Sequence, residues 1–205
     1  MKRYNFILLI INLFLISPFV SAQTQIQLDV EPDSIFYFKD ERDKKSYKAI
    51  TFGNVSWMAE PLRYKTSDSW CYKIKNACKT YGRMYIWEDA IQACPPGWKL
   101  PDTSNWASLI NIFGGEKIAG AGIAFYDSLT FQINYAFPPN IYGRFADSAN
   151  EMHFWSATSV GENTAWHYYV VKDKLPYIAK SYISKNYNLS CLCVKEEITS
   201  TSSTD

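Results

Sequence analysis

Apolar residues recur at helical spacing in the stretch that ends at residue 94. Trp87, Ala90, Ile91 and Cys94 occupy positions i, i+3, i+4 and i+7, which places them on one face of an α-helix. Two acidic residues follow Trp87, near the helix N-terminus, where the helix dipole favours negative charge. The segment Pro95–Gly97 prevents continuation because proline lacks a backbone N–H and clashes with the preceding turn. The pattern therefore predicts a helix that ends at Cys94.

A second helix is predicted directly after this proline-containing turn. Its apolar face has the same spacing and consists of Trp106, Leu109, Ile110 and Phe113. Asp102 or Thr103 can cap its N-terminus, since a short polar side chain accepts hydrogen bonds from the first free N–H groups. Gly114 and Gly115 predict its end.

Short β-prone runs lie on both sides of these helices. Before them, the Gly53–Asn54 pair separates two such runs and predicts a hairpin. The predicted strands are 35–38, 46–52, 55–59, 153–156, 165–171, 177–182 and 188–195. Residues 70–85 show no periodicity, and residues 118–150 combine glycine, proline and aromatic residues in a pattern typical of a long loop region. Helices and separate strand runs together predict an α+β fold with two helices and a long loop region.

The N-terminus has the three parts of a secretory signal peptide. Lys2 and Arg3 precede an apolar run, Pro18 interrupts it, and small residues follow up to Ala22. The run from Phe6 to Val20 is shorter than the roughly 20 apolar residues that a membrane-spanning helix requires. We therefore expect residues 1–22 to be cleaved and the protein to be secreted or exposed at the cell surface, without a stable membrane span after cleavage.

The remaining chain has the composition of one globular domain. The sequence of 205 residues is 47% hydrophobic, which is enough to form a core. We expect a linker or edge strand at 23–39, the main domain at 40–195 and a disordered tail rich in Ser and Thr at 196–205. Removing the two basic residues of the signal peptide leaves 19 basic and 20 acidic residues. This balance gives no electrostatic reason to expect binding to nucleic acid.

The five cysteines all follow the predicted cleavage site. They are Cys71, Cys78, Cys94, Cys191 and Cys193. In an exported chain this pattern favours disulfides over a metal site, and the odd number leaves one free thiol. A bridge between Cys71 and Cys78 would close a small loop and hold a segment that has no periodicity of its own.

Aromatic, glycine and cysteine residues recur along the chain in a characteristic order. They are Tyr47-Lys48, Gly53-Asn54, Trp57-Met58-Ala59-Glu60, Trp70-Cys71-Tyr72, Cys78, Tyr81-Gly82-Arg83, Tyr85, Trp87, Ala90, Ala93-Cys94-Pro95, Gly97-Trp98, Leu100-Pro101, Trp106, Gly114-Gly115, Trp155-Ser156, Trp166 and Cys193-Val194-Lys195. In this order they resemble the Fibrobacter succinogenes major paralogous domain family, and the resemblance covers most of the chain from about Asp40 to Lys195. It implies an exported bacterial protein with a C-type-lectin-like fold: two helices, small antiparallel sheets and a long loop region.

The resemblance also implies a disulfide between two cysteines that lie far apart in the sequence. In lectin-like domains a cysteine at the end of the first helix pairs with one in the final strand, which corresponds here to Cys94 and Cys193. The sequence departs from the family pattern just before the last cysteine, where it has Cys191 and Leu192. In a strand, Cys191 and Cys193 would share one face about 6.6 Å apart, so either could compete for Cys94. Cys191 is expected to be the free, buried thiol.

The candidate binding residues lie in the loop region and in the strands beside it. Aromatic side chains there can stack on a sugar or a peptide, or can pack in the core. The expected contact residues are Tyr126, Tyr135, Asn140, Tyr142, Arg144, Asp147, Trp166 and Tyr168. By contrast, Trp57, Trp87, Trp98, Trp106 and Trp155 are expected to form the core.

Metal and catalytic chemistry have little support in the sequence. Calcium needs several carboxylate oxygens, whereas Pro138–Asn140 and Trp155–Ala157 contain no acidic residue. His153 and His167 are expected to be ordinary core or surface histidines, and no catalytic or phosphate-binding motif is present. A related fold in formylglycine-generating oxidases uses a cysteine pair near the end of the chain, but a bridge to Cys193 leaves no dithiol here.

These observations favour a non-enzymatic binding module, without metal or cofactor, that recognises a glycan or a surface protein. The alternative is a structural or assembly component of a cell-surface complex.

Overall fold

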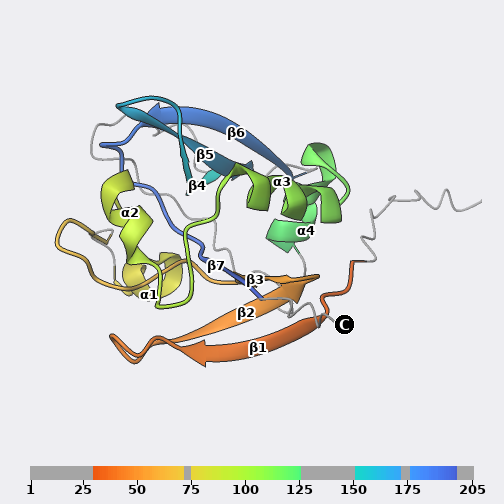
Figure 1. Ribbon diagram of the computed structural model, residues 1–205, viewed down its shortest axis with the longest axis horizontal. Helices are drawn as coiled ribbons and strands as arrows, with labels where there is room; N and C mark the ends of the chain where they lie inside the picture. Colours follow the sequence, from red (N-terminus) through yellow and green to blue (C-terminus); the bar gives the residue numbers. More distant parts are fainter. Residues whose placement is uncertain (1–29, 72–74, 126–150, 172–175, 198–205) are drawn as a thin grey trace, which may run out of the picture.

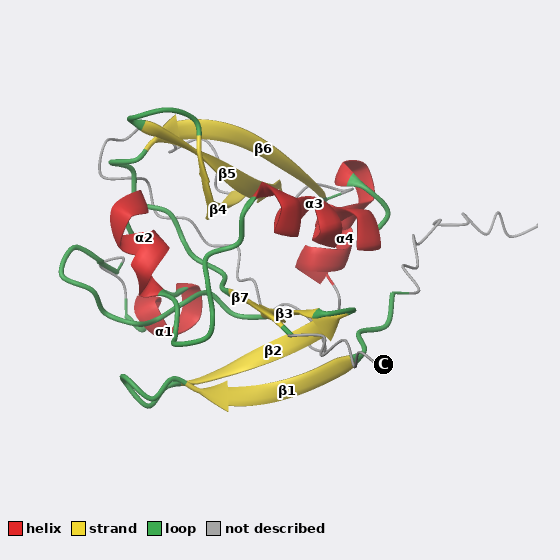
Figure 2. Cartoon of the chain, in the orientation of Figure 1, coloured by secondary structure: helices red, strands yellow, loops and turns green. Residues whose placement is uncertain are grey.

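The computed structural model describes residues 30–71, 75–125, 151–171 and 176–197 (Figure 1). Along the chain the elements are β1 (Ser34–Lys39), β2 (Ser46–Phe52), β3 (Val55–Met58), α1 (Ala77–Tyr81), α2 (Trp87–Ala93), α3 (Thr103–Ile112), α4 (Glu116–Phe125), β4 (Glu151–Ser159), β5 (Thr164–Val171), β6 (Tyr177–Ser184) and β7 (Val194–Glu196). The protein is α+β, as predicted, with short helices placed between two small antiparallel sheets (Figure 2).

The predicted signal peptide, residues 23–29, the loop residues 126–150 and residues 198–205 lie outside the described part of the chain. None of the helices in the described part is both long and apolar enough to cross a membrane.

The first sheet has the strand order β1-β2-β3-β7, and every pairing in it is antiparallel. The predicted hairpin is confirmed: β2 and β3 are joined by the Gly53–Asn54 turn, with Phe52 opposite Val55. Gly53 has a φ of 61°, a left-handed conformation that favours glycine in tight hairpin turns. β1 pairs with β2 along its whole length, contains the β-prone run predicted at 35–38, and is the terminal strand of this sheet among the described residues.

The second sheet is an antiparallel meander with the order β4-β5-β6. Its strands contain the β-prone runs that the sequence predicts at 153–156, 165–171 and 177–182. The last predicted run differs: residues 189 and 190 form isolated bridges, and only Val194–Glu196 is a strand. Glu196, which was expected in the tail, therefore belongs to the first sheet.

The two predicted helices form, with local differences. α2 ends at Ala93, and Cys94 is extended (φ −63°, ψ 151°) because two prolines follow it. Ile91 is exposed, so the buried face of this two-turn helix is made by Ala90 and Ala93. In α3 the cap is Asp102, whose carboxylate accepts hydrogen bonds from the N–H groups of Ser104 (2.8 Å) and Asn105 (2.9 Å).

The described residues contain two further helices that periodicity did not predict. α1 has five residues and follows Asn76, which adopts a left-handed conformation. α4 extends into the region 118–150, which the sequence predicts as a loop because of Gly120 and Gly122. Gly120 is in fact a packing residue: a Cβ placed there would collide with backbone atoms of Tyr177. The glycine lets the helix approach β6 closely. Gly120 is therefore required for packing and does not indicate a loop.

The core consists of two clusters that join the sheets to the helices. One surrounds Trp57 and Trp106, and the other surrounds Tyr85 and Trp155. Trp57, Trp106 and Trp155 are buried, as predicted, whereas Trp87 and Trp98 are only partly buried. Trp87 lies at the start of α2 and donates its Nε1–H to Ser156 O at 2.8 Å. Trp98 lies in the turn after α2 and stacks on the Phe38 ring at 4.3 Å, which fixes β1 to that turn.

Candidate functional site

The described residues include two of the eight predicted contact positions. Tyr126, Tyr135, Asn140, Tyr142, Arg144 and Asp147 lie outside the described part of the chain. Trp166 and Tyr168 lie two residues apart on β5, so their side chains leave the same face of the second sheet. Their surroundings nevertheless differ.

Tyr168 is a core residue, which corrects its prediction as a contact residue. Its ring stacks on Trp106 of α3, with 4.8 Å between ring centroids and an interplanar angle of 15°. Burial, with smaller contributions from the acidic side chains of Glu116 and Asp102, raises its pKa to about 12. Helix α3 packs against the sheet at this position. The sequence of β5 alone does not show which of its residues α3 contacts.

Trp166 is not buried beneath α3, and its ring forms an aromatic corner with a residue of β6. Tyr182 is directly opposite Trp166 in the strand register, and the two rings meet edge to face, with centroids 5.7 Å apart and an angle of 89°. Tyr182 is 59% exposed, and Trp166 is half-buried. The exposed side chain of Lys180 places Nζ 5.3 Å from the Trp166 ring centroid. We call these three residues the Trp166 patch.

The sequence analysis did not identify Lys180 and Tyr182. Both lie in the β-prone run 177–182, but their proximity to Trp166 depends on the register between β5 and β6. The alternation of residues along β6 shows that 180 and 182 share a face, but it does not show which face is exposed, so it is only a weak signal of an exposed site.

The opposite face of the same sheet has a group of aromatic and acidic side chains. His153 of β4 has its ring centroid 5.2 Å from both His167 and Tyr169 of β5. His153 Nε2 lies 3.1 Å from a carboxylate oxygen of Glu151. Within the described ranges, no group of three His, Cys, Asp or Glu side chains has an arrangement that could hold a metal ion.

His167 is the buried member of this group and has 4% of its surface exposed. Burial, together with the neighbouring His153, lowers its pKa to about 3. The imidazole is therefore neutral at physiological pH. A buried neutral ring of this kind packs in the sheet and is poorly placed for proton transfer.

The disulfide predictions can be compared directly with the structure. Cys94 is bonded to Cys193, with Cα atoms 5.8 Å apart, and Cys71 is bonded to Cys78, with Cα atoms 5.3 Å apart. Cys191 is the free thiol and is fully buried, and burial raises its pKa. Cys193 is therefore unavailable for a dithiol with Cys191, and a buried thiol with a raised pKa is a poor nucleophile.

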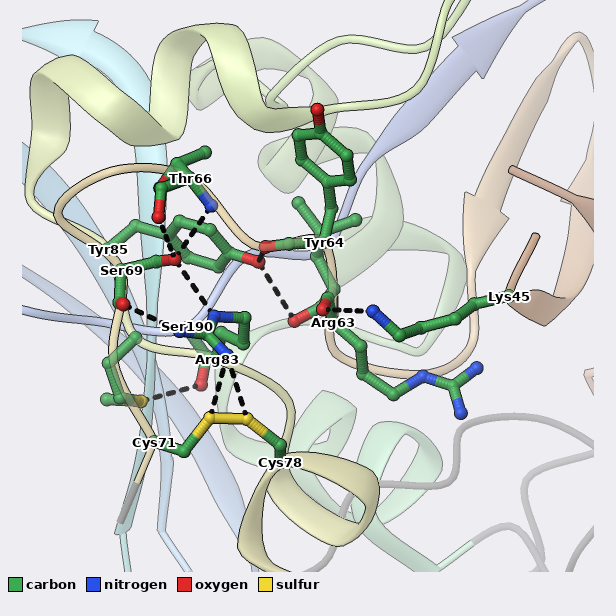
Figure 3. Close-up of a disulfide and its surroundings, with 12 residues drawn as sticks. Lys45, Arg63, Tyr64, Thr66, Ser69, Cys71, Cys78, Arg83, Tyr85 and Ser190 are labelled. Carbon is green, nitrogen blue, oxygen red and sulfur yellow. Dashed lines mark hydrogen bonds between the residues drawn. A yellow bond between two sulfur atoms is a disulfide. The ribbon is translucent and has the colours of Figure 1, made fainter. Parts of the chain in front are cut away.

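Arg83 lies against the smaller disulfide (Figure 3). Its Nη1 is 3.1 Å from Cys71 Sγ and 3.3 Å from Cys78 Sγ. The same guanidinium donates from Nε to Ser69 Oγ at 2.9 Å and from Nη2 to Ser69 O at 2.6 Å. These contacts fix the loop that the sequence predicted to be held by a disulfide. Arg83 therefore has a structural role.

The sequence analysis considered two segments as possible calcium ligands, and the described one, Trp155–Ala157, contributes to the core. Trp155 is buried and donates its Nε1–H to Tyr85 O at 2.8 Å. Ser156 accepts the N–H of Thr158 through Oγ. The other segment of that test, residues 138–140, lies outside the described ranges.

Comparisons of the chain with protein-family models, with curated proteins and with solved structures gave no match. The case for a function therefore depends on the fold and on the Trp166 patch.

Proposed function

We propose that this protein is an exported bacterial binding module of the C-type-lectin-like type, without catalytic activity, that recognises a glycan at the cell surface. The α+β architecture with two small antiparallel sheets supports this fold type. So does the disulfide from the end of α2 to the segment before β7. The resemblance of the sequence to the Fibrobacter succinogenes major paralogous domain family is further support. Two disulfides also suit an exported protein.

The observation that carries the proposal is the aromatic corner of the Trp166 patch. Two rings at nearly a right angle offer a face and an edge to the same ligand. The apolar C–H face of a pyranose ring can pack on such an aromatic face, and aromatic residues are enriched at recognition surfaces. Lys180, whose Nζ lies over the Trp166 ring, adds N–H donors that suit hydroxyl groups or the carboxylate of an acidic sugar.

The rigid position of Trp166 favours binding as well. It lies in the central strand of the meander and pairs with Tyr182 of β6, and the edge-to-face contact with that tyrosine holds its ring. A ligand would therefore meet a ring that is already held in place, which lowers the entropic cost of association.

A glycan array probed with the purified exported protein tests this proposal. We expect binding to a restricted set of sugars, and at least about tenfold weaker binding for Trp166→Ala and Tyr182→Ala, because aromatic anchors dominate binding energy. Tyr177→Ala is the matched control, since Tyr177 is an exposed tyrosine of the same strand whose side chain leaves the opposite face from Tyr182. Binding that is unchanged in Trp166→Ala would refute the proposed site.

The second candidate function is an assembly component of a cell-surface complex. The edge strand β1 favours it, because no strand of the described residues pairs with its outer side and such an edge can pair with another chain. The absence of binding to every sugar on the array, together with co-purification of one protein partner, would favour this second function.

A further inference from the structure

The outer edge of β1 has the features of an interface. β1 is the terminal strand in the order β1-β2-β3-β7, and among the described residues no strand pairs with its outer side. Figure 1 shows it along the lower border of the molecule, with no labelled element beyond it. Ile35 and Tyr37 are 42% and 69% exposed. Natural edge strands are usually protected by proline, bulges or central charges, and residues 34–38 have none of these.

The hydrogen-bond pattern shows which backbone groups are available. Asp40 N donates to Lys45 O at 2.8 Å, so this pair is a hydrogen-bonded one at the end of the β1–β2 ladder. Because such pairs alternate in an antiparallel ladder, the even-numbered residues of β1 bond to β2. The N–H and C=O groups of Ile35, Tyr37 and Lys39 therefore point away from β2, toward the free edge.

We propose that two copies of this chain pair through β1, antiparallel, about a twofold axis at Phe36. This register places Ile35 of one copy opposite Tyr37 of the other, twice, in hydrogen-bonded pairs made by the free backbone groups. It also joins the two four-stranded sheets into one continuous sheet. A twofold axis makes the interface self-complementary, which is the commonest arrangement in homodimers.

Charge complementarity selects this register. Lys39 lies at one end of β1, and Asp33 lies just before the other end. With the axis at Phe36, Lys39 of each copy is opposite Asp33 of the other copy. A shift of the axis to Tyr37 would instead place Asp33 opposite Glu41, two like charges, and would leave Lys39 opposite Ile35. Opposite charges across a strand pair stabilise it, and like charges destabilise it.

The contact between two single strands buries a small area, so we expect a weak dimer. Sedimentation velocity of the purified exported protein, in a concentration series extending to high micromolar, measures it. We expect the sedimentation coefficient to rise with concentration toward that of a dimer. A protein that stays monomeric throughout the series overturns the proposal.

Tyr37→Pro tests the strand edge without removing a bond to β2. The N–H of Tyr37 points to the free edge, and proline is tolerated at such positions of an edge strand. We expect this variant to keep the far-UV circular dichroism of the parent and to remain monomeric. Tyr37→Thr is the control, since it keeps the N–H and favours a strand. A Tyr37→Pro variant that is folded and dimerises like the parent overturns the proposal.

A charge exchange tests the register and keeps the test valid if the proline variant fails to fold. Lys39→Asp and Asp33→Lys should each weaken dimerisation about tenfold or more, because each places like charges opposite one another. An equimolar mixture of the two variants restores both opposite-charge pairs in the heterodimer and should associate like the parent. Failure of the mixture to associate more tightly than either variant alone overturns the register.

Discussion

Replacing Cys94 and Cys193 together with alanine removes the covalent link between the end of α2 and the segment before β7. The bridge spans a sequence separation of 99 residues, which in the chain-entropy model corresponds to about 4.7 kcal/mol of the free energy of unfolding. Cys71 and Cys78 are separated by 7 residues, and the same relation gives about 2.5 kcal/mol for that bridge. For a chain of this size each kcal/mol lowers the melting temperature by roughly 2–4 °C. We therefore expect a fall of about 10–20 °C for the first pair and about 5–10 °C for the second.

Thermal unfolding followed by circular dichroism measures both changes. Cys191→Ala is the matched control, because it removes a buried sulfur of the same core cluster without breaking a bridge. Its cost should be on the order of 1 kcal/mol, from lost packing alone. An equal fall in melting temperature for the two disulfide variants, or for Cys191→Ala and the Cys94/Cys193 variant, would refute the loop-entropy reasoning.

Three further predictions concern Cys191, His167 and Asp102. Under non-reducing conditions, intact mass after alkylation should show no modified cysteine in the native protein and one in denaturant, because Cys191 is buried and the other four are bridged; a label on the native protein would contradict its burial. The pKa of His167 is lowered from 6.5 to about 3 in the folded protein. Between pH 6.5 and about 3, therefore, the unfolded state binds a proton at His167 and the folded state does not. Acidification through this range lowers the free energy of unfolding by up to about 1.4 kcal/mol per pH unit because of this one residue. His167→Phe should flatten the dependence of chemical denaturation on pH in that range, and an unchanged slope would show that the ring is protonated in the folded state. Asp102→Ala should cost about 1 kcal/mol in urea unfolding because α3 loses its N-cap, whereas Asp102→Asn keeps an acceptor and should cost much less; equal losses would refute the capping role.

The sequence was sufficient wherever the signal is local. The helical spacing from Trp87 and from Trp106 predicted α2 and α3, and the Gly53–Asn54 turn predicted the β2–β3 hairpin. These features depend on the conformational preferences of neighbouring residues, so they can be recognised without knowing what packs against them. The Cys94–Cys193 bridge was predicted from the family resemblance, since no local pattern distinguishes Cys193 from Cys191.

Only the tertiary structure decided the features that depend on distant contacts. α4 was missed because Gly120 resembles a loop residue until β6 is placed against it. Tyr168 and Trp166 look equivalent in sequence, yet α3 covers the first and leaves the second beside Tyr182. The amino-acid sequence by itself thus determined the local elements, because they depend on nearby residues. Tertiary packing determined which aromatic side chains are buried and which remain exposed, because burial depends on elements far away in the chain.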